Sequence, residues 1–456
     1  MQLSIPQILQ LAPDASAAKA GQGLAKLSQW HQLGRHDQFV WGYCQGSGKE
    51  PYRAQIDLTE PAFKCSCPSR KFPCKHGLGL LLLFADEVSA FADASMPDWV
   101  QAWQQSRSER AQKQLDQAQK KSVEASDAKP PEADAAEQAK VPNKRAAQRE
   151  ARVMAGVQDA MRWLEDLVRT GLVAARAQPY AYWDSAAARL VDAQAPGLAR
   201  RVRQLPQFLR GDDWQHALLA QLGKLYMLMQ AYQGLSSLPM AVQADVRAAI
   251  GWTLEQQQLL QQEAASAHWQ VMAVSTEQEE QLSTRRTWLQ QQASGQLALL
   301  LEFSVAHAPR SGTNLLVGFQ VQGELVFFPG AVEQRALLKP NYQLLDCAAA
   351  CQHGFHRIDA FLAHAAEFVA RNPWLERSAG LLCQMHFVLR EGRWQLRDGE
   401  GALLALSPRL GEQIWLLHAL AGGAPLNLFG EWDTEYFLPR SYWMQETWHS
   451  LPQEVA

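Results

Sequence analysis

The sequence predicts an α+β protein of several domains: a small strand-plus-helix module, a helical middle domain and an antiparallel α+β domain toward the C-terminus. The chain has 456 residues, a length typical of about three domains. Apolar and polar residues alternate toward both ends of the chain, whereas apolar residues recur at helical spacing in the middle. A segment without aromatic residues, 104–150, separates the first block from the others.

Residues 1–103 are the first expected domain. Segments 39–43 and 52–58 are expected to be strands, and apolar and polar side chains alternate in the second of them. The residues between them, Gln45-Gly46-Ser47-Gly48, are typical of a turn, so the two strands are expected to form a hairpin. Segment 75–92 is expected to be a buried helix, because it is rich in leucine and poor in β-branched residues.

Residues 104–150 are interpreted as a flexible linker. Ala, Gln, Lys and Glu dominate this segment, and its ten basic and eight acidic residues nearly cancel. It has no cysteine, and its only large aliphatic residues are Leu115, Val123 and Val141, too few for a hydrophobic core. Such a composition is typical of a solvated tether between folded domains.

Residues 151–293 are expected to form a helical domain. The expected first helix carries an apolar stripe at Val153, Val157, Met161, Leu164, Val168 and Leu172. A second helix is expected from Trp214 to Met229, with Gly234 placed to end it. A third shows the same spacing at Val242, Val246, Ile250 and Leu254. Stripes of this kind usually pack against other helices, so we interpret them as core rather than as a cofactor site.

Residues 294–456 are expected to form an antiparallel α+β domain. The expected strands, which are apolar or alternating runs, are 297–305, 315–321, 324–328, 383–389 and 394–396. Gln322-Gly323 is a signal for a tight turn between two of them. A helix is expected over 358–370, because Asn372-Pro373 would end it.

Composition and charge exclude several classes of protein. The 43 Lys and Arg against 46 Asp and Glu give a formal net charge of −3, which argues against a protein that coats nucleic acid along its whole length. No apolar run reaches the about 18 residues that a membrane helix needs, and residues 1–20 lack the basic start of a secretory signal. Three of the seven cysteines fall within ten residues, which is typical of metal binding in a reducing compartment. We therefore expect a cytoplasmic protein without a membrane segment.

Four metal-binding side chains between residues 65 and 76 are the most informative feature of the sequence. They follow the pattern Cys65-x-Cys67-x6-Cys74-x-His76. Three thiolates and one imidazole make a closed set of ligands, which is typical of a structural zinc site, because a catalytic zinc keeps one position for water. The first pair is expected at the end of a strand and the second at the start of the leucine-rich helix, so Zn2+ would stabilise the small module. The alternative is a set of reduced cysteines packed in a small core without a metal.

This motif resembles that of the SWIM-type zinc finger, which is Cys-x-Cys, a variable spacer and Cys-x-His. Segments 41–48, 51–52 and 67–76 are also similar to a bacterial subgroup of SWIM proteins. The resemblance implies a zinc-binding domain of strands and a helix that binds DNA or proteins. It implies that the zinc ligands are Cys65, Cys67, Cys74 and His76. It also implies partners, since members of the subgroup are often encoded beside AAA+ ATPases and von Willebrand factor A-domain proteins.

Four basic residues surround the expected ligands, and residues 63–76 contain no acid: Lys64, Arg70, Lys71 and Lys75. Their positive charge would help to keep the thiolates ionised. One interpretation is a solvated rim on a module that binds protein. The other is a nucleic-acid surface, in which these residues contact phosphates while Phe72 and Tyr52 offer stacking faces.

A phosphate-binding loop is weakly suggested by Gly46-Ser47-Gly48-Lys49. The spacing from Gly42 is one residue too long, and Glu50 stands where the loop needs Ser or Thr. We interpret this segment as the turn of the hairpin. The carboxylates Glu431, Asp433 and Glu435 beside Trp432 are likewise interpreted as solvated residues of a turn.

A second metal site is weakly suggested by a group of potential ligands, Cys347, Cys351, His353 and His356. Their spacing matches no zinc arrangement that we can justify, so half-buried cysteines and surface histidines are the preferred interpretation. Cys44 and Cys383 are interpreted as small core residues.

The expected function follows from the closed zinc motif and from what the sequence lacks. No Ser-His-Asp arrangement, paired carboxylate or open metal set is recognisable, so we expect no enzymatic activity. We expect a zinc-binding interaction module or adaptor whose partner is a protein, such as an AAA+ ATPase. The alternative is DNA binding through the basic rim of the finger.

Overall fold

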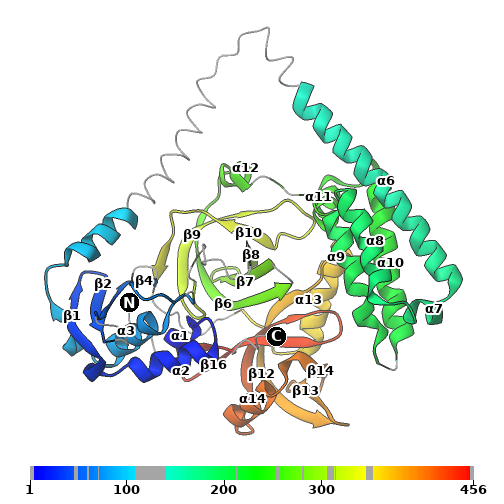
Figure 1. Cartoon of the computed structure of the whole chain (residues 1–456). Helices are drawn as coiled ribbons and strands as arrows, with labels where there is room; N and C mark the ends of the chain where they lie inside the picture. Colours follow the sequence, from blue (N-terminus) through cyan, green and yellow to red (C-terminus); the bar gives the residue numbers. More distant parts are fainter. Residues whose placement is uncertain are drawn as a thin grey trace.

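The computed structural model describes residues 5–45, 50–58, 61–69, 71–107, 140–211, 213–252, 254, 256–279, 282–305, 313, 315–345 and 353–451. It is an α+β structure, as predicted, with an N-terminal strand module that holds the cysteine cluster, a helical middle part and a C-terminal region of two sheets. The two sheets lie between the module and the helices (Figure 1). Among the described residues, no helix has the length and apolarity to span a bilayer.

The N-terminal module is a five-stranded sheet with helices on both faces. Its strands, in sheet order, are β4 (Ala62–Cys65), β3 (Tyr52–Asp57), β2 (Phe39–Cys44), β1 (Trp30–His36) and β5 (Ala92–Asp93). One face is covered by α3 (Lys75–Asp86), and α1 (Ile5–Gln10) and α2 (Ala15–Leu24) pack against α3. On the other face, Val100 and Trp103 of helix 98–107 pack with Phe39 and Trp41.

The predicted hairpin and helix of this module are both present. β2 and β3 pair antiparallel, with Phe39 opposite Asp57 and Cys44 opposite Tyr52. The turn between them, 46–49, lies outside the described residues, and so does the pattern that resembles a phosphate-binding loop. α3 begins at Lys75 as expected but ends at Asp86 rather than near residue 92, because a short 3-10 turn follows at Val88–Ala90.

The middle of the chain is a bundle of helices around one core. Its members are α6 (Lys140–Thr170), α7 (Leu172–Arg176), α8 (Tyr180–Asp192), α9 (Pro196–Gln204), α10 (Trp214–Gln233) and α11 (Met240–Ile250). Trp183 and Tyr232 are fully buried at its centre. Gly234 caps the end of α10 as predicted. The predicted stripe on α6 is buried at its first four positions, but Val168 is exposed.

The structure shifts both ends of the predicted helical domain. α6 begins at Lys140, inside the segment expected to be linker, while residues 108–139 of that segment lie outside the described residues. The expectation of helix up to residue 293 is wrong, because β6 (Ser266–Glu279) and β7 (Leu282–Gln291) form a long antiparallel pair there, after the short α12 (Gln256–Leu260). Trp269, Val271 and Val274 in β6 are aromatic or β-branched residues, which favour a strand.

The second sheet closes on itself. Its order is β10 (Arg335–Leu338), β8 (Leu297–Val305), β7, β6, β9 (Gln320–Phe327) and β11 (Gln343–Leu345), and β10 also pairs with β9. Trp269, Val271, Leu289, Leu300 and Val321 share its core. The expected tight turn at Gln322-Gly323 is wrong, because both residues lie within β9. A Cβ at Gly323 would lie 2.8 Å from Tyr342 Cβ, so this glycine permits a close approach of two segments rather than a turn.

The third sheet is antiparallel and is covered by two helices. Its order is β14 (Leu403–Ala405), β13 (Arg393–Arg397), β12 (Ser378–Arg390), β15 (Leu426–Trp432), β16 (Phe437–Met444) and β17 (Thr447–Ser450). The helices are α13 (Ile358–Arg371), close to its predicted bounds, and α14 (Gln413–Ala421). The predicted strands 383–389 and 394–396 lie within β12 and β13, which pair as a hairpin. Its turn residues Glu391 and Gly392 both have positive φ, as a tight hairpin turn requires.

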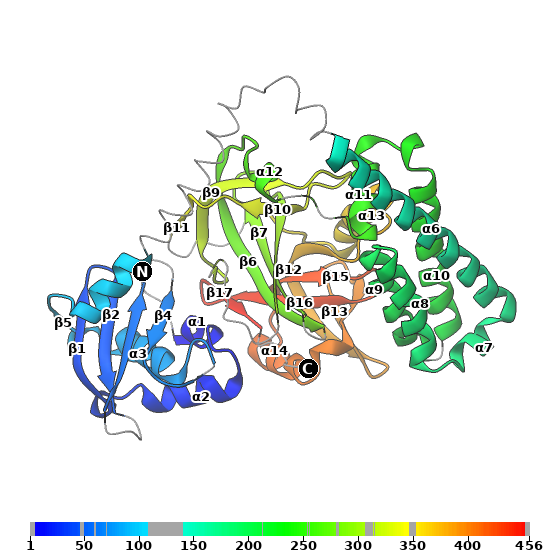
Figure 2. The ribbon, with the colours of Figure 1, turned by 45° about the horizontal axis from the view of Figure 1, so that its top comes forward.

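The parts of the molecule contact one another through apolar side chains. The second and third sheets share a core that includes Trp288, Leu381 and Phe429. Leu316 and Phe319, next to β9, belong to the core of the N-terminal module. α1 and α2 accordingly lie between the sheet of the module and the C-terminal sheets (Figure 2).

Candidate metal centre

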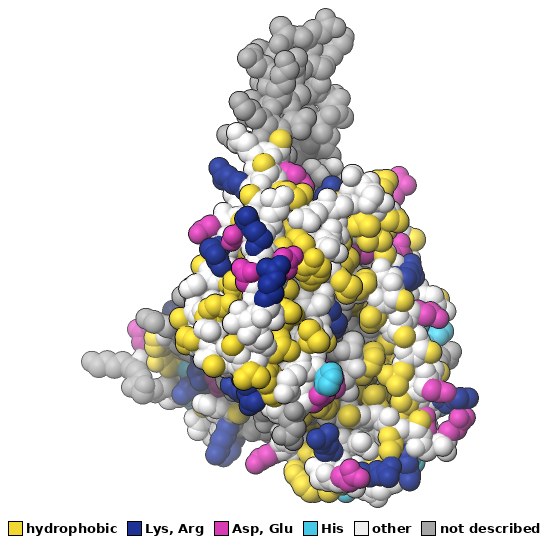
Figure 3. Space-filling view, turned by 90° about the vertical axis from the view of Figure 1, so that its right-hand side faces the viewer, with side chains coloured by type: hydrophobic (Ala, Val, Ile, Leu, Met, Phe, Trp, Pro, Cys, Tyr) yellow, Lys and Arg dark blue, Asp and Glu magenta, His cyan; other side chains and the backbone are white. Residues whose placement is uncertain are grey.

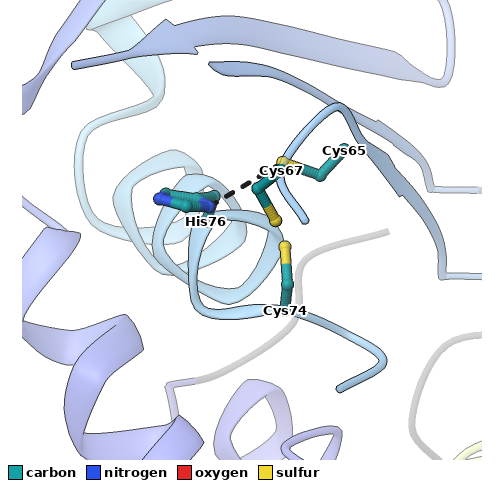
Figure 4. Close-up of side chains that lie close together, drawn as sticks. All are labelled: Cys65, Cys67, Cys74 and His76. Atoms are coloured by element: carbon teal, nitrogen blue, oxygen red, sulfur yellow. Dashed lines mark hydrogen bonds between the residues drawn. The ribbon is translucent and has the colours of Figure 1, made fainter. Parts of the chain in front are cut away.

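Two elements of the N-terminal module bring the four predicted ligands together. Cys65 is the last residue of β4 and Cys67 follows it, while Cys74 is the N-cap of α3 and His76 lies in its first turn. The side chains point toward one another (Figure 4). Their ligand atoms all lie within 4.8 Å of one another, and Cys65 Sγ is 3.8 Å from His76 Nδ1. The sequence-based set of ligands is therefore one cluster in space.

The geometry of this cluster fits a zinc ion. Zn–S bonds of about 2.3 Å and Zn–N bonds of about 2.0–2.1 Å place tetrahedral ligand atoms about 3.6–3.8 Å apart. The Cys65–His76 distance already matches that edge, and the remaining atoms need only small shifts. Three sulfurs and one imidazole nitrogen are a common donor set for structural zinc, and they leave no open position. Within the part of the chain that the structure describes, this is the one group of three or more such side chains close enough to hold a metal.

One of the three thiols, that of Cys74, is poised to bind a metal as a thiolate. A hydrogen bond from the Cys65 thiol, together with bonds from His76 and from the Gly77 amide at 3.5 Å, lowers the pKa of Cys74 to about 4. The hydrogen bond that it donates to Cys74 and its burial raise the pKa of Cys65, and burial raises that of Cys67. Zinc would displace the protons of Cys65 and Cys67 and so bind all three sulfurs as thiolates.

Glycines in α3 let the two pairs of ligands approach, and the sequence analysis missed this role. A Cβ at Gly77 would lie 2.9 Å from Phe63 Cδ1, so only glycine lets α3 begin so close to β4. A Cβ at Gly79 would lie 2.8 Å from Leu24 Cβ, so α2 also crosses α3 closely. Glycine costs a helix about 1 kcal/mol relative to alanine. Two glycines in a leucine-rich helix were thus the available signal of close packing.

The basic rim around the site differs from its sequence-based description. Lys64 and Lys75 are exposed and make no ion pair with another described residue. Lys71 Nζ lies 2.7 Å from Asp14 Oδ2, and Lys71 holds the pKa of Asp14 below its usual value. Asp14 also accepts a hydrogen bond from the Ala17 amide and so caps α2. Arg70 lies outside the described residues. The acid-free run of sequence therefore acquires an acid from a distant segment.

The other candidate ligands do not form a described site. Cys347 and Cys351 lie outside the described residues. His353 packs against Gly295, and its Nε2 lies 2.9 Å from the Gln292 carbonyl oxygen. Cys44 and Cys383 are buried, consistent with core positions. A second metal site, which the sequence suggests only weakly, has no support among the described residues.

The carboxylates near Trp432 correct a further expectation. Asp433 and Glu435 are exposed, but Glu431 is only 2% exposed, so its interpretation as solvated is wrong. It accepts hydrogen bonds from Trp288 Nε1 at 2.9 Å and from three guanidinium groups, those of Arg286, Arg377 and Arg440. These donors come from β7, from β16 and from the residue before β12, so the sequence around Glu431 does not reveal the cluster.

Comparisons with known proteins match two parts of this chain. A family model for the SWIM zinc finger matches residues 62–84, which include β4, the four ligands and most of α3. A second family model, for the SWIM-associated four-helix bundle domain, matches residues 148–250, which run from within α6 to the end of α11. A search of curated proteins and a search of solved structures each found no match.

Proposed function

We propose that this chain, which carries a SWIM zinc finger and a SWIM-associated four-helix bundle, is a non-enzymatic adaptor that binds a partner protein. The zinc has a structural role in this proposal. Its closed donor set leaves no position for a reacting water, and the ligands hold β4 against α3. SWIM zinc fingers bind zinc and mediate contacts to proteins or DNA, and the bundle supplies the surface that favours protein.

The observation that carries the proposal is the solvent face of α10. Leu219, Gly223 and Met227 follow one another at spacing four, and the two large side chains are 50% and 48% exposed. We call these residues the α10 stripe. No atom lies within 4 Å of a Cβ placed on Gly223, so the stripe is open. The whole helix contains one residue of the Lys, Arg, Asp and Glu types, the half-buried Lys224.

Exposed apolar side chains aligned on one face of a helix can form a binding site for another protein. On the side of the molecule that shows the bundle, hydrophobic side chains form areas between Lys, Arg, Asp and Glu (Figure 3). A mixed surface around an apolar strip favours a protein partner over a polyanion. An AAA+ ATPase is the partner class that we put forward, with a von Willebrand factor A-domain protein as the next.

The test measures binding of the zinc-loaded chain to an AAA+ ATPase and to an A-domain protein from the same genome by biolayer interferometry. Leu219→Glu and Met227→Glu each place a charge in the contact and should weaken binding by about tenfold or more. Met240→Glu is the matched control, because Met240 is 87% exposed at the start of α11, outside the stripe. Equal loss in all three variants, or no binding by the parent chain, would count against the adaptor.

DNA binding by the rim is the second candidate, favoured by the exposure of Lys64 and Lys75. Because Lys71 is paired with Asp14, fewer phosphates can be neutralised than the four basic residues of the sequence suggest. The slope of log affinity against log salt for duplex DNA should be about −2 to −3, at about −0.9 per phosphate. Changing Lys64, Arg70, Lys71 and Lys75 together to Gln should abolish this binding and leave the zinc content unchanged. Polarisation titrations at two salt concentrations test the idea, and unchanged binding would refute it.

A further inference from the structure

A large cleft lies where the three parts of the molecule meet. Its volume is about 3560 Å3. The segment between α1 and α2 and the zinc-site loop at Lys71 and Phe72 line one side, α9 to α11 line another, and strands of both C-terminal sheets line the rest. The two ribbon views agree on this arrangement, with the sheets between the module and the bundle (Figures 1 and 2). Neither the zinc site nor the α10 stripe explains why the molecule has a cleft of this size.

The lining of the cleft is strongly basic. It contains twelve Lys and Arg but six Asp and Glu. The whole chain, by contrast, has 43 basic and 46 acidic residues. Positive charge is thus concentrated in the cleft of a protein whose net charge is negative. Clefts lined by one sign of charge focus the electrostatic field and attract ligands of the opposite sign.

Seven of the twelve cations already have acidic partners, so the positive charge open to a ligand is carried by the other five. Glu376 pairs with Arg200 and Arg201. Glu277 pairs with Arg377 and with Arg440, whose Nη2 lies 2.9 Å from its Oε1. The lining has further cations that make no ion pair with a described residue: Arg210, Lys224, Arg247, Arg335 and Arg409.

Aromatic rings lie among these cations. Phe303 is 53% exposed, Phe72 is partly exposed, and both line the cleft. The guanidinium carbon of Arg335 lies 4.2 Å from the centre of the Phe328 ring, so a cation and a ring face present one combined surface. Sites for single-stranded nucleic acid have this composition, a positive groove for the phosphates and aromatic faces on which bases stack. A duplex buries its base faces within its own stack, and an acidic peptide needs no ring faces.

We propose that the cleft binds a single-stranded nucleic acid, with phosphates near Arg210, Lys224 and Arg409 and bases against Phe303 and Phe72. The site is separate from the α10 stripe, so the proposal does not depend on the adaptor function. It also differs from the rim, because Lys64 and Lys75 do not line the cleft. The zinc-site loop forms part of the wall, so the finger contributes Phe72 as a stacking face.

The experiment titrates the full-length, zinc-loaded chain with fluorescent single strands of about 20 nucleotides, as DNA and as RNA. The cleft variant carries Arg210→Gln, Lys224→Gln and Arg409→Gln. The control carries Arg390→Gln, Arg393→Gln and Arg397→Gln, three exposed charges of the β12–β13 region outside the cleft. The cleft variant should lose affinity about tenfold or more at low salt, with a salt slope shallower by about 2, at about 0.7 per phosphate. The control should stay within about twofold of the parent. Equal loss in both, or no binding by the parent to either strand, overturns the proposal.

Two further measurements separate stacking from charge. Phe303→Ala keeps every charge and should weaken single-strand binding by about fivefold or more. A duplex of the same sequence and poly-glutamate should compete poorly with the single strand. If Phe303→Ala binds like the parent, or if poly-glutamate displaces the strand as well as unlabelled strand does, the cleft recognises charge alone and the proposal fails. Lys64→Gln with Lys75→Gln should leave cleft binding unchanged, and a loss there would assign the binding to the rim.

Discussion

Glu431 should be one of the most sensitive positions in the C-terminal half of the chain. Its carboxylate joins Arg286, Arg377 and Arg440, from β7, the start of β12 and β16, to a strand of the third sheet. Burial raises its pKa, but the charges of the three arginines outweigh this effect, so the pKa lies below its usual value. The substitution Glu431→Gln keeps the shape of the side chain and removes its charge. Among the described residues, Glu277 then remains paired with Arg377 and Arg440, and Arg286 loses its carboxylate partner.

The expected loss of stability in Glu431→Gln arises because buried arginine charges are left without a partner. Removing one member of a buried charged group costs about 3–5 kcal/mol, because the remaining ions stay desolvated. For a unit of 150–250 residues, this loss lowers the melting temperature by roughly 6–20 °C, at about 2–4 °C per kcal/mol. Glu435→Gln is the matched control in the same sequence cluster. Glu435 is exposed, so its change should alter stability by less than about 0.5 kcal/mol.

Thermal unfolding measures the difference in stability between the two variants. Hydrogen exchange of peptides from β15 and β16 shows whether the loss of stability lies in the strands around Glu431. Exchange in these strands should accelerate in Glu431→Gln and stay at the parental rate in Glu435→Gln. A loss of less than about 1 kcal/mol in Glu431→Gln would refute the reasoning, since it would mean that water or another acid balances the arginines.

Four other outcomes are expected. Cys67→Ser should release zinc, detected by elemental analysis, and remove on the order of 10 kcal/mol from the module while the bundle keeps its helical circular dichroism; one zinc per chain in this variant would contradict the ligand set. Gly79→Ala should destabilise the module by about 1–3 kcal/mol in thermal melts, although alanine favours helix, because its Cβ would lie 2.8 Å from Leu24 Cβ; a higher melting temperature would argue against close packing. Because the pKa of Glu431 is lowered from 4.5, its ionised form should stabilise the parent fully above pH 4.5 and progressively less below it. Glu431→Gln should lack this pH dependence, and melting temperatures measured above and below pH 4.5 check the difference. Limited proteolysis should cut first within 104–150, and a first cut elsewhere would contradict the prediction that this segment is a flexible linker.

The local parts of this structure could be predicted from the sequence. The four ligands fall within twelve residues, so their spacing alone was enough to group them, and the matched family model includes all four. The hairpin of β12 and β13 was likewise recognisable, because the turn residues stand between two short apolar runs. In each case, the residues that determine the structure lie next to one another in the chain.

Features that depend on distant residues were missed. Lys71 meets Asp14 from another element, so the rim looked free of acids. Glu431 pairs with arginines from β7, from β16 and from the residue before β12, and nothing beside it in sequence distinguishes it from the exposed Glu435. Gly323 looked like a turn because the approach of Tyr342 is visible only in space. The pairing of β6 with β7 was missed because helix was expected there, although Trp269, Val271 and Val274 favour a strand.

The position of Leu316 and Phe319 in the core of the N-terminal module has a consequence for how the chain is made. The module is synthesised first, but part of its apolar core arrives only with residues 316 and 319. Ribosomes add about 5–20 residues per second, so residues 108–319 take roughly 10–40 s to appear. During that time the nascent module, zinc-bound or not, presents an incomplete surface on the side of α1 and α2. A chaperone that covers exposed apolar surfaces would therefore bind this chain in the middle of its translation rather than at its end.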